Sequence, residues 1–526
     1  MNLNSDKPES QTNRNSVKLL ASSSIVSFWT FVSRLLGLVR DIVFTSLLGA
    51  GVALDAYVVI TKIPNVFRRI FAEGAFNQAF VPVLSEYKEG SDESEVRVLI
   101  NNIFGLLSSS LLLITLIVLL LTPIFVFIFA PGFYSEPIKN ELATDILRIT
   151  FPYLFFVSLV ALSGSIMNTY GKFSIPALTP VFYNLILVCT AIWIAPLYEV
   201  PIYVIAWGMF VAGCIQLLIQ IYPLIKLKLL PNFSLNLNHP GVKKVLYLMI
   251  PGIIAGGVSQ LNMLVDTILA SFLPTGSPTW LYVSDRLMQL PLGIFAIAIG
   301  TVLLPRLSSL HQTEDKEGFS RTMDWSIRLV LLIGVPSIIG LVLLSEPIIL
   351  TLFERGEFIA SDTRQASFSL IALALGLIAF MLIKVLTPGF FARQNPKTPL
   401  KVAAASMVIN AVLAWLLAFY LGFNHVGLAI ASSIAAYFSI TILLFILLKN
   451  KIYQVQKGWI IFLGRIFVAC LVMTVIVNLM NVEMFAWREL DQVVRFMQLL
   501  LITFSGIASY LAVLWISGLR LRDLKG

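Results

Sequence analysis

Long stretches without a charged side chain constrain this chain more than any other feature of its sequence. The 28 residues Ile103–Ala130 contain no Asp, Glu, Lys or Arg, and neither do the 47 residues Val402–Leu448. A helix that crosses a bilayer needs about 20 mostly apolar residues. The first stretch therefore fits one crossing, and the second fits two crossings with a turn at Gly422–His425. These stretches predict a chain that crosses a membrane several times.

The composition supports the same prediction. Hydrophobic residues make up 58% of the 526 residues and charged residues 12%, whereas soluble domains contain about 45–50% apolar and about 25% charged residues. The chain lacks the charge to cover a water-facing surface, which excludes a cytosolic enzyme, a secreted disulfide scaffold and a disordered chain. The three cysteines, Cys189, Cys214 and Cys470, lie in apolar runs and are interpreted as small buried hydrophobic residues.

We predict an all-α polytopic membrane protein with about fourteen transmembrane helices. The predicted spans are 19–48, 53–84, 99–130, 144–170, 174–196, 201–226, 245–273, 278–304, 326–352, 366–392, 399–421, 426–448, 459–481 and 494–518. An even number of spans places both termini on one side of the membrane. The tails and loops of that side hold 23 of the 37 basic residues and the opposite loops hold six.

This distribution of basic residues predicts that both termini are cytoplasmic, because cytoplasmic loops carry an excess of Lys and Arg. The formal net charge of +9 is then a topology signal, and no nucleic-acid partner is predicted.

An internal repeat is visible when the two halves of the chain are compared. Val32–Val39 and Val258–Val265 agree at five of eight positions, and each half then holds six spans in the same orientation, a common plan among transporters. From the amino terminus, we predict a cytoplasmic tail (1–18), an N-lobe (19–228), a C-lobe (229–448), two further helices (459–518) and a cytoplasmic tail (519–526). Chance similarity between helices rich in Leu and Val is the alternative.

Charged residues inside the predicted spans carry the functional information. A charged side chain at the centre of a spanning helix costs about 2.5–3.5 kcal/mol on insertion scales, so it normally faces a partner or a cavity. The positive ones in the first, second and eighth spans are Arg34, Arg40, Lys62, Arg68, Arg69 and Arg286, and the negative ones are Asp41, Asp55, Glu73 and Asp285. Asp55, Lys62 and Arg69 are spaced by two heptads, which predicts one shared helical face, and Arg69 and Glu73 are spaced for pairing.

Two interpretations of these charges remain open. Local pairing would make Arg40, Arg69 and Arg286 helix-locking residues. Even so, six positive and four negative residues leave a surplus of two positive charges, and an unneutralised charge in a low-dielectric interior is unfavourable. A bound anion explains the surplus, and the planar fork of arginine favours a diphosphate.

Motifs of ATP-driven motors and of enzymes are missing. The sequence contains no G-x-x-x-x-G-K-[ST] phosphate loop, and His239, His311 and His425 are scattered in predicted loops. We therefore predict neither catalysis nor a resident cofactor.

Several motifs resemble the MurJ/MviN lipid II flippases. The similarity is most specific in Ser33–Asp41 and in Lys62–Pro82, which includes the run Arg69-Ile-Phe-Ala-Glu-Gly-Ala-Phe76. Later motifs that agree are Phe173–Ala177, Asp285–Met288, Lys384–Phe390, Arg393-Gln394 and Lys397–Pro399. The resemblance covers essentially the whole chain.

The resemblance implies the MOP exporter fold, with two six-helix lobes around a central cavity and two extra helices that line a groove for a lipid tail. It implies a bacterial inner (plasma) membrane location and, as the partner, undecaprenyl-diphosphate-linked muropeptide, lipid II, moved from the cytoplasmic to the outer leaflet. The family's cavity arginines correspond to Arg34, Arg40, Arg68 and Arg286, and Asp55 matches a carboxylate of a family motif. Lys62, Arg69 and Glu73 are further candidates.

Two features qualify the resemblance. Many relatives carry Glu where this chain has Gln289, so a charge relay through that position is in doubt. Some relatives are thought to use sodium in the second lobe, where Asp266 and Asn410 are this chain's candidates; a helix-locking role for Asp266 is the alternative. Rival functions are a MOP-fold exporter of another polyprenyl-diphosphate oligosaccharide or of a drug, and a non-transporting scaffold that binds cell-wall synthesis proteins.

Overall fold

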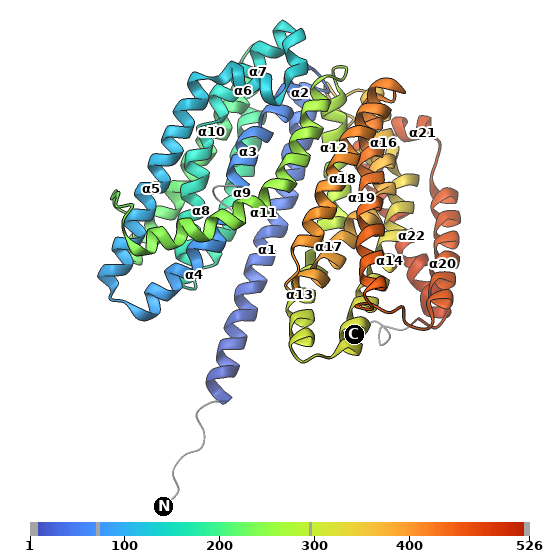
Figure 1. Cartoon of the computed structure of the whole chain (residues 1–526). Coiled ribbons are helices and arrows are strands. Elements are labelled where there is room, and N and C mark those ends of the chain that lie inside the picture. The colour runs from blue at the N-terminus through green and yellow to red at the C-terminus, as the bar shows by residue number, and fades with distance from the viewer. Residues whose placement is uncertain (1–8, 70–73, 294–296, 520–526) are drawn as a thin grey trace, which may run out of the picture. The chain divides into compact units, whose positions relative to one another are not determined.

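The computed structural model describes residues 9–69, 74–293 and 297–519, and these residues are predominantly helical (Figure 1). The helices of the first half are α1 (Glu9–Leu48), α2 (Val52–Ile60), α3 (Lys62–Arg68), α4 (Ala75–Gly90), α5 (Glu93–Leu120), α6 (Thr122–Phe129), α7 (Pro137–Thr150), α8 (Tyr153–Thr169), α9 (Ser174–Cys189) and α10 (Pro201–Lys226). Those of the second half are α11 (Pro240–Ser271), α12 (Ser277–Pro291), α13 (Ile297–Gln312), α14 (Lys316–Leu343), α15 (Ser345–Phe353), α16 (Ala360–Leu375), α17 (Leu377–Phe391), α18 (Lys397–Trp415), α19 (Asn424–Lys449), α20 (Trp459–Met480), α21 (Met484–Glu489) and α22 (Gln492–Ile516).

Ten helical segments among the described residues are long and apolar enough to cross a membrane. The chain is therefore a multi-pass membrane protein, as predicted, while the count of fourteen stays a prediction. The four predicted spans outside these ten are 19–48, 53–84, 245–273 and 278–304. They are the first two spans of each half, and they carry most of the charges singled out in the sequence.

Several predicted spans consist of two helices because residues unsuited to a helix interior interrupt them. The span 144–170 divides at Pro152 between α7 and α8, since proline lacks the backbone N–H that a helix interior uses. The span 366–392 divides at Gly376 between α16 and α17. The span 53–84 is interrupted at Thr61, between α2 and α3.

These interruptions recur in the two halves of the chain. Helices α9 and α18 both end in a π-helical turn, at Thr190–Ile194 and at Leu416–Tyr420, which are separated by the same offset as Val32 and Val258. Helices α5 and α14 both end in a kinked residue, Leu121 with φ −107° and ψ 22° and Leu344 with φ −108° and ψ 16°. The π turns lie at positions related by the repeat offset and support the internal repeat, and the two kinked residues end equivalent helices at a spacing that differs by three residues.

The chain forms two compact units. The first contains Met1–Leu48 and Ala56–Leu261, and the second contains Gly49–Asp55 and Asn262–Gly526. Within the first unit α1 packs on α9, and α10 packs on α7, α8 and α9. Within the second, α18 packs on α19, and α12 packs on α16. The predicted boundary between the lobes, at residues 228 and 229, divides the chain by its internal repeat. The two compact units divide the chain by a different criterion, so this boundary stays a prediction.

The linker that follows the sixth predicted span is fastened to α5. Asn102 Oδ1 accepts hydrogen bonds from Ser234 Oγ at 2.8 Å and from the backbone N–H of Asn236 at 3.2 Å, and Asn101 Oδ1 accepts one from the N–H of Asn232 at 2.8 Å. Gly105 leaves room for this crossing, because a Cβ there would lie 1.9 Å from the carbonyl oxygen of Ser234. The first unit thus holds its own linker against one of its helices.

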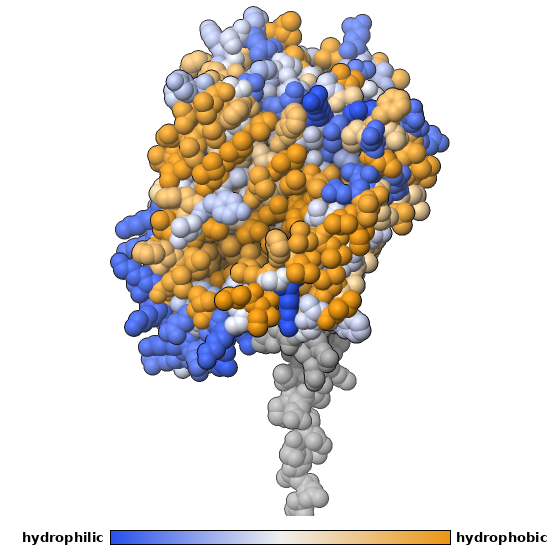
Figure 2. Space-filling model, turned by 90° about the vertical axis from the view of Figure 1, so that its right-hand side faces the viewer, coloured by the Kyte–Doolittle hydropathy of each residue, from blue (hydrophilic) through white to orange (hydrophobic). Residues whose placement is uncertain are grey.

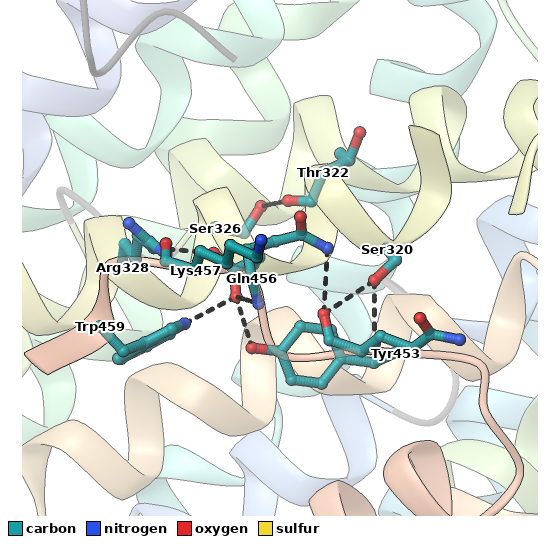
Figure 3. A network of polar contacts seen from close by, with 10 residues as sticks. Ser320, Thr322, Ser326, Arg328, Tyr453, Gln456, Lys457 and Trp459 are labelled. Carbon is teal, nitrogen blue, oxygen red and sulfur yellow. Dashed lines mark hydrogen bonds and ion pairs between the residues drawn. The ribbon is translucent and has the colours of Figure 1, made fainter. Parts of the chain in front are cut away.

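The second unit has a corresponding contact at Asp324 of α14, which bonds to the linker between α19 and α20. Figure 3 shows Tyr453, Gln456 and Trp459 beside Ser320 and Arg328 of α14. Its Oδ1 accepts hydrogen bonds from Tyr453 Oη at 2.6 Å, from Trp459 Nε1 at 2.8 Å and from the N–H of Gln456 at 3.2 Å. Its Oδ2 lies 2.7 Å from Arg328 Nε. Burial and then the bond to Asp324 raise the pKa of the Tyr453 phenol, so this hydroxyl remains a donor. We call this group of residues the Asp324 latch.

The opposite ends of α20 and α22 are held by Arg488 of α21. Its Nε lies 3.2 Å from Glu354 Oε1 and its Nη2 lies 3.3 Å from Glu346 Oε1. Between the latch and this ion-pair cluster, buried side chains of α14, α20 and α22 form one hydrophobic core, which includes the fully buried Trp487. Figure 2 shows a face of the molecule that is largely hydrophobic, with hydrophilic residues concentrated towards its upper and lower ends.

Candidate substrate site

Arg40 of α1 is fixed by its neighbours. Its Nη2 lies 2.6 Å from Asp41 Oδ1, and its Nη1 donates to Asn184 Oδ1 of α9 at 3.1 Å. Its guanidinium carbon lies 5.9 Å from the ring centroids of both Phe44 and Tyr183. Asp41 is 1% exposed, so the positive charge has a buried counter-ion beside it. This geometry agrees with the local pairing of the alternative interpretation.

Asn184 connects α9 to two places on α1. Besides accepting from Arg40, it donates to the carbonyl oxygen of Ser33 at 3.0 Å. The two helices therefore meet through an asparagine that uses both its acceptor and its donor. Ser33 precedes Arg34 directly, so the contact between Asn184 and Ser33 also positions the backbone next to Arg34.

Arg34 differs from Arg40 in its surroundings. Its side chain is exposed, and within the described part of the chain it forms neither an ion pair nor a hydrogen bond. The five N–H donors of a guanidinium in this state are available to a ligand. Of the cationic side chains singled out in the first two predicted spans, Arg34 and Arg69 share this condition among the described residues.

The other candidates of the first unit lie at the ends of α3. Lys62 begins this helix and is half-buried, and Arg68 ends it with its Nε donating to Asn65 Oδ1 at 3.3 Å. Arg69 follows and is exposed. The shared face predicted for Asp55, Lys62 and Arg69 crosses the interruption at Thr61, where the backbone keeps helical angles, and it stays a prediction. Glu73 lies outside the described residues.

Asp55 belongs to the second unit and is completely buried. Its Oδ2 accepts from the N–H of Gly276 at 2.7 Å, and its Oδ1 accepts from the Thr279 hydroxyl at 2.7 Å and from the Thr279 N–H at 3.1 Å. These donors lie at the start of α12, where backbone N–H groups lack partners within the helix. Asp55 thus supplies a helix cap from a distant part of the sequence, while its predicted substrate contact stays a prediction.

Arg286 lies on α12, the helix that Asp55 caps. It is half-buried, as is Asp285 beside it. The amide of Gln289 donates to Asp285 Oδ2, so the residue that replaces the Glu of many relatives is bonded to the neighbouring carboxylate. Arg286 and Asp55 lie in the second unit and Arg34, Arg40 and Arg68 in the first.

Asp266 of α11 and Asn410 of α18 lie together, as the sodium hypothesis requires. Asn410 Nδ2 donates to Asp266 Oδ1 at 2.6 Å, and Asn410 Oδ1 accepts from Ser432 Oγ at 3.3 Å. Asn410 is 2% exposed. Carboxylate, amide and hydroxyl oxygens suit a hard cation, but the Asn410 amide must turn to offer its oxygen beside Asp266.

The two asparagine contacts occupy equivalent places in the repeat. The offset that relates Val32 to Val258 also relates Arg40 to Asp266 and Asn184 to Asn410. Each half therefore joins its first predicted span to its fifth through one asparagine and one charged residue, with opposite charges in the two halves.

The comparisons with known proteins decide the family. A family model described as lipid II flippase MurJ matches residues 44–498. This chain belongs to the MurJ family. The probable lipid II flippase MurJ of Vibrio cholerae serotype O1 is 43% identical over 517 residues, which cover 97% of this chain and 98% of that protein. A solved structure of the lipid II flippase MurJ in an inward closed conformation is 29% identical, has a TM-score of 0.78 and covers 95% of this chain and 99% of its own.

The MurJ fold is also similar to that of a more distant transporter. An inward-facing multidrug resistance MATE family transporter of the MOP superfamily gives a TM-score of 0.65 at 14% identity, over 79% of this chain and 94% of that one. This similarity concerns the fold alone and confirms the expected MOP architecture. The MurJ family consists of transporters, which confirms the prediction that the chain is not an enzyme.

Sequence reasoning missed Asn184, although a signal for it was present in this MurJ chain. Adding the repeat offset to Asn184 gives Asn410, which the sequence did single out. The capping role of Asp55 left no comparable signal, because its donors, Gly276 and Thr279, belong to the other half of the sequence.

Proposed function

We propose that this chain moves lipid II from the cytoplasmic to the outer leaflet by alternating access, with both termini in the cytoplasm. Membership of the MurJ family supports the substrate. The excess of basic residues in the tails and alternate loops supports the orientation. The saccharide headgroup crosses in a polar environment while the prenyl tail remains in lipid.

The diphosphate of the substrate is held by arginines, with Arg34 as the first contact. The observation that carries this assignment is the exposure of Arg34 and its lack of a partner within the described residues, in a predicted span whose other charged residues, Arg40 and Asp41, pair with each other. Arg40 differs because Asp41 already neutralises it. Arg68, Arg69, Lys62 and Arg286 supply further positive charge, and Arg forks are suited to bidentate phosphate contacts.

An ion gradient drives the return of the empty transporter. A ligand shifts a conformational equilibrium only if it binds the two states with different affinity. Sodium at Asp266, Asn410 and Ser432 would supply that difference once the Asn410 amide turns its oxygen towards Asp266. Its support is the direct contact of Asn410 with the Asp266 carboxylate and with the Ser432 hydroxyl. The absence of a phosphate-loop motif from the sequence agrees with a drive other than ATP hydrolysis on this chain.

A depletion experiment tests the proposed function. Cells that depend on this chain are depleted of it, and the leaflet in which lipid II accumulates is determined by its accessibility to a membrane-impermeant reagent. We expect accumulation in the cytoplasmic leaflet. Unchanged exposure of lipid II on the outer surface would contradict the proposal and would favour a scaffold for cell-wall enzymes. Collapse of the membrane potential at constant ATP is expected to stop exposure in undepleted cells.

A further inference from the structure

The segment Lys226–Ile250, which joins α10 to α11, has an unusual composition. It contains four lysines and no acidic residue. Lys244 pairs with Glu86 of α4. Lys226, Lys228 and Lys243 are exposed, and their ammonium groups have no partner within the described residues. Three positive charges therefore project from a short segment without being neutralised by the protein.

Apolar side chains alternate with anchored polar ones along this segment. Ser234 and Asn236 are bonded to Asn102 of α5. The Ser234 bond is made by its side chain and the Asn236 bond by its backbone N–H. In the extended stretch before the turn at 237–238 successive side chains point to opposite sides, so the neighbours of Ser234, Phe233 and Leu235, point away from the protein. Phe233, Leu235 and Leu237 are 65%, 51% and 52% exposed. The bonds to Asn102 thus fix which side chains face outward.

The start of α11 continues the same surface. Val242 and Val245 are buried, and Gly241 contacts Leu99 of α5 and Tyr87 of α4, so one face of the helix packs on the first unit. The other face exposes Tyr247 and Ile250 at 76% and 57%. Figure 1 shows this part of α11 running alongside α4 and α5.

The crossing point lies at the boundary between polar and apolar sequence. Asn102 follows Arg97, the last charged residue of α5, by little more than one helical turn, and the rest of α5 carries no charge. At 1.5 Å per residue, Asn102 lies about 14 Å along α5 from its first residue. Asn102 also lies near the start of the predicted span 99–130. The segment bonded to it is therefore expected near the membrane interface, where apolar side chains enter lipid and lysines extend towards phosphates.

We propose that Lys226–Ile250 forms a binding surface for anionic phospholipid. Lys226, Lys228 and Lys243 contact lipid phosphates, while Phe233, Leu235 and Leu237 enter the acyl region. The unneutralised positive charge beside outward apolar side chains carries this assignment, because a purely apolar surface would not distinguish an anionic from a zwitterionic lipid. The surface is independent of the lipid II site and of the proposed transport function.

Spin labels test the depth of the surface. Single cysteines replace Phe233, Leu235 and Leu237, and also the exposed polar residues Asn232 and Asn238, in a chain whose three native cysteines are changed to alanine. The protein is reconstituted as single copies in lipid nanodiscs. We expect labels at 233, 235 and 237 to be relaxed by oxygen and labels at 232 and 238 by a water-soluble nickel chelate. Relaxation of the first three by the chelate, or their protection from both reagents, would overturn the proposal.

Brominated lipids test the preference for anionic headgroups. A fluorophore on a cysteine at position 235 is measured in mixed phosphatidylglycerol and phosphatidylcholine nanodiscs in which only one lipid is brominated. We expect quenching about twofold stronger when phosphatidylglycerol carries the bromine. Lys226→Gln, Lys228→Gln and Lys243→Gln together should equalise the two samples.

A matched control removes charge elsewhere on the chain. Lys316→Gln with Arg321→Gln changes two exposed basic residues in a segment that also contains Glu314, Asp315 and Glu317. This variant should keep the preference for phosphatidylglycerol. Equal quenching in the unmodified protein, or an equal loss in the control variant, would refute the assignment of these lysines.

Discussion

Two contacts at equivalent places in the repeat show how one framework serves opposite charges. In the first unit Asn184 presents its oxygen to Arg40, and in the second Asn410 presents its amide nitrogen to Asp266. Asparagine carries both an acceptor and a donor, so turning one amide adapts the same helix pair to a cation or to a carboxylate. The repeat has preserved the helix pairing while the charge at its centre has changed.

The two contacts also differ in how the charge is balanced. Arg40 has Asp41 beside it, whereas the repeat places Thr267 beside Asp266, and Thr267 is bonded to the carbonyl of Met263. The sequence neighbour neutralises the charge of Arg40, whereas Thr267 is uncharged and is bonded to its own helix. A cation site in the second unit and an anion site on the neighbouring arginines of the first are consistent with this difference.

The largest effect is expected at two arginines of the proposed substrate site. Arg34→Ala and Arg68→Ala should each abolish complementation of a depletion strain at normal protein level, because the diphosphate loses a charge-assisted contact. Arg→Lys should restore growth poorly, since an ammonium cannot reproduce the bidentate fork.

The control for this prediction is Arg465→Ala on α20, which changes an arginine of a spanning helix that lies outside the proposed site. It should complement fully. Full growth of the depletion strain with Arg34→Ala and with Arg68→Ala would show that these arginines are not needed to bind the substrate.

The next effect separates the two equivalent charges by phenotype. Arg40→Ala should weaken lipid II binding, whereas Asp266→Asn should leave binding largely intact, slow turnover and remove the sodium dependence of transport. Purified protein in liposomes provides all three measurements. A preserved sodium response together with a lowered melting temperature would identify Asp266 as a helix-locking residue instead.

Asp55 differs from Asp266 in its expected role, because the bonds of its carboxylate cap the start of α12. Asp55→Ala leaves the N–H groups of Gly276 and Thr279 and the Thr279 hydroxyl without this acceptor, which should lower the free energy of unfolding by about 1–3 kcal/mol. Asp55→Asn keeps an acceptor oxygen and should be milder. Thermal unfolding of the purified variants measures both effects. Unchanged stability with loss of lipid II binding would favour a substrate contact.

The smallest effect concerns the asparagines themselves. Asn184→Ala and Asn410→Ala should each reduce stability by about 0.5–1.5 kcal/mol, as expected for the loss of hydrogen bonds between helices. Ser432→Ala is the matched control for Asn410, because it removes only one weak bond at 3.3 Å. If Asn410→Ala left both the stability and the sodium response unchanged, the contact between Asn410 and Asp266 would have no role in folding or in ion binding.

Much of the fold was predictable because a bilayer imposes a simple rule on apolar length. The charge-free runs located α5, α6, α18 and α19, and the match between Val32–Val39 and Val258–Val265 found the repeat before the equivalent π turns were visible. The interruption at Thr61 agrees with Pro64, which has no backbone N–H to donate to the carbonyl of Ile60 at the end of α2. The bonds of Asp55 depend on a fold that brings Gly276 and Thr279 to it, so no local pattern could reveal them.

The bonds that hold the linker between α10 and α11 have a consequence for where the connection between the two halves of the repeat can bend. Bonds to Asn101 and Asn102 hold the linker, and Gly241, Val245 and Lys244 hold the first turns of α11 to the same unit. With the linker and the first turns of α11 attached to the first unit, we expect bending between the two halves of the repeat to occur within α11. Its sequence beyond Val245 contains Pro251, Gly252, Gly256 and Gly257, residues that lower the stiffness of a helix. We therefore expect α11 to remain stiff along most of its length and to bend at these proline and glycine residues.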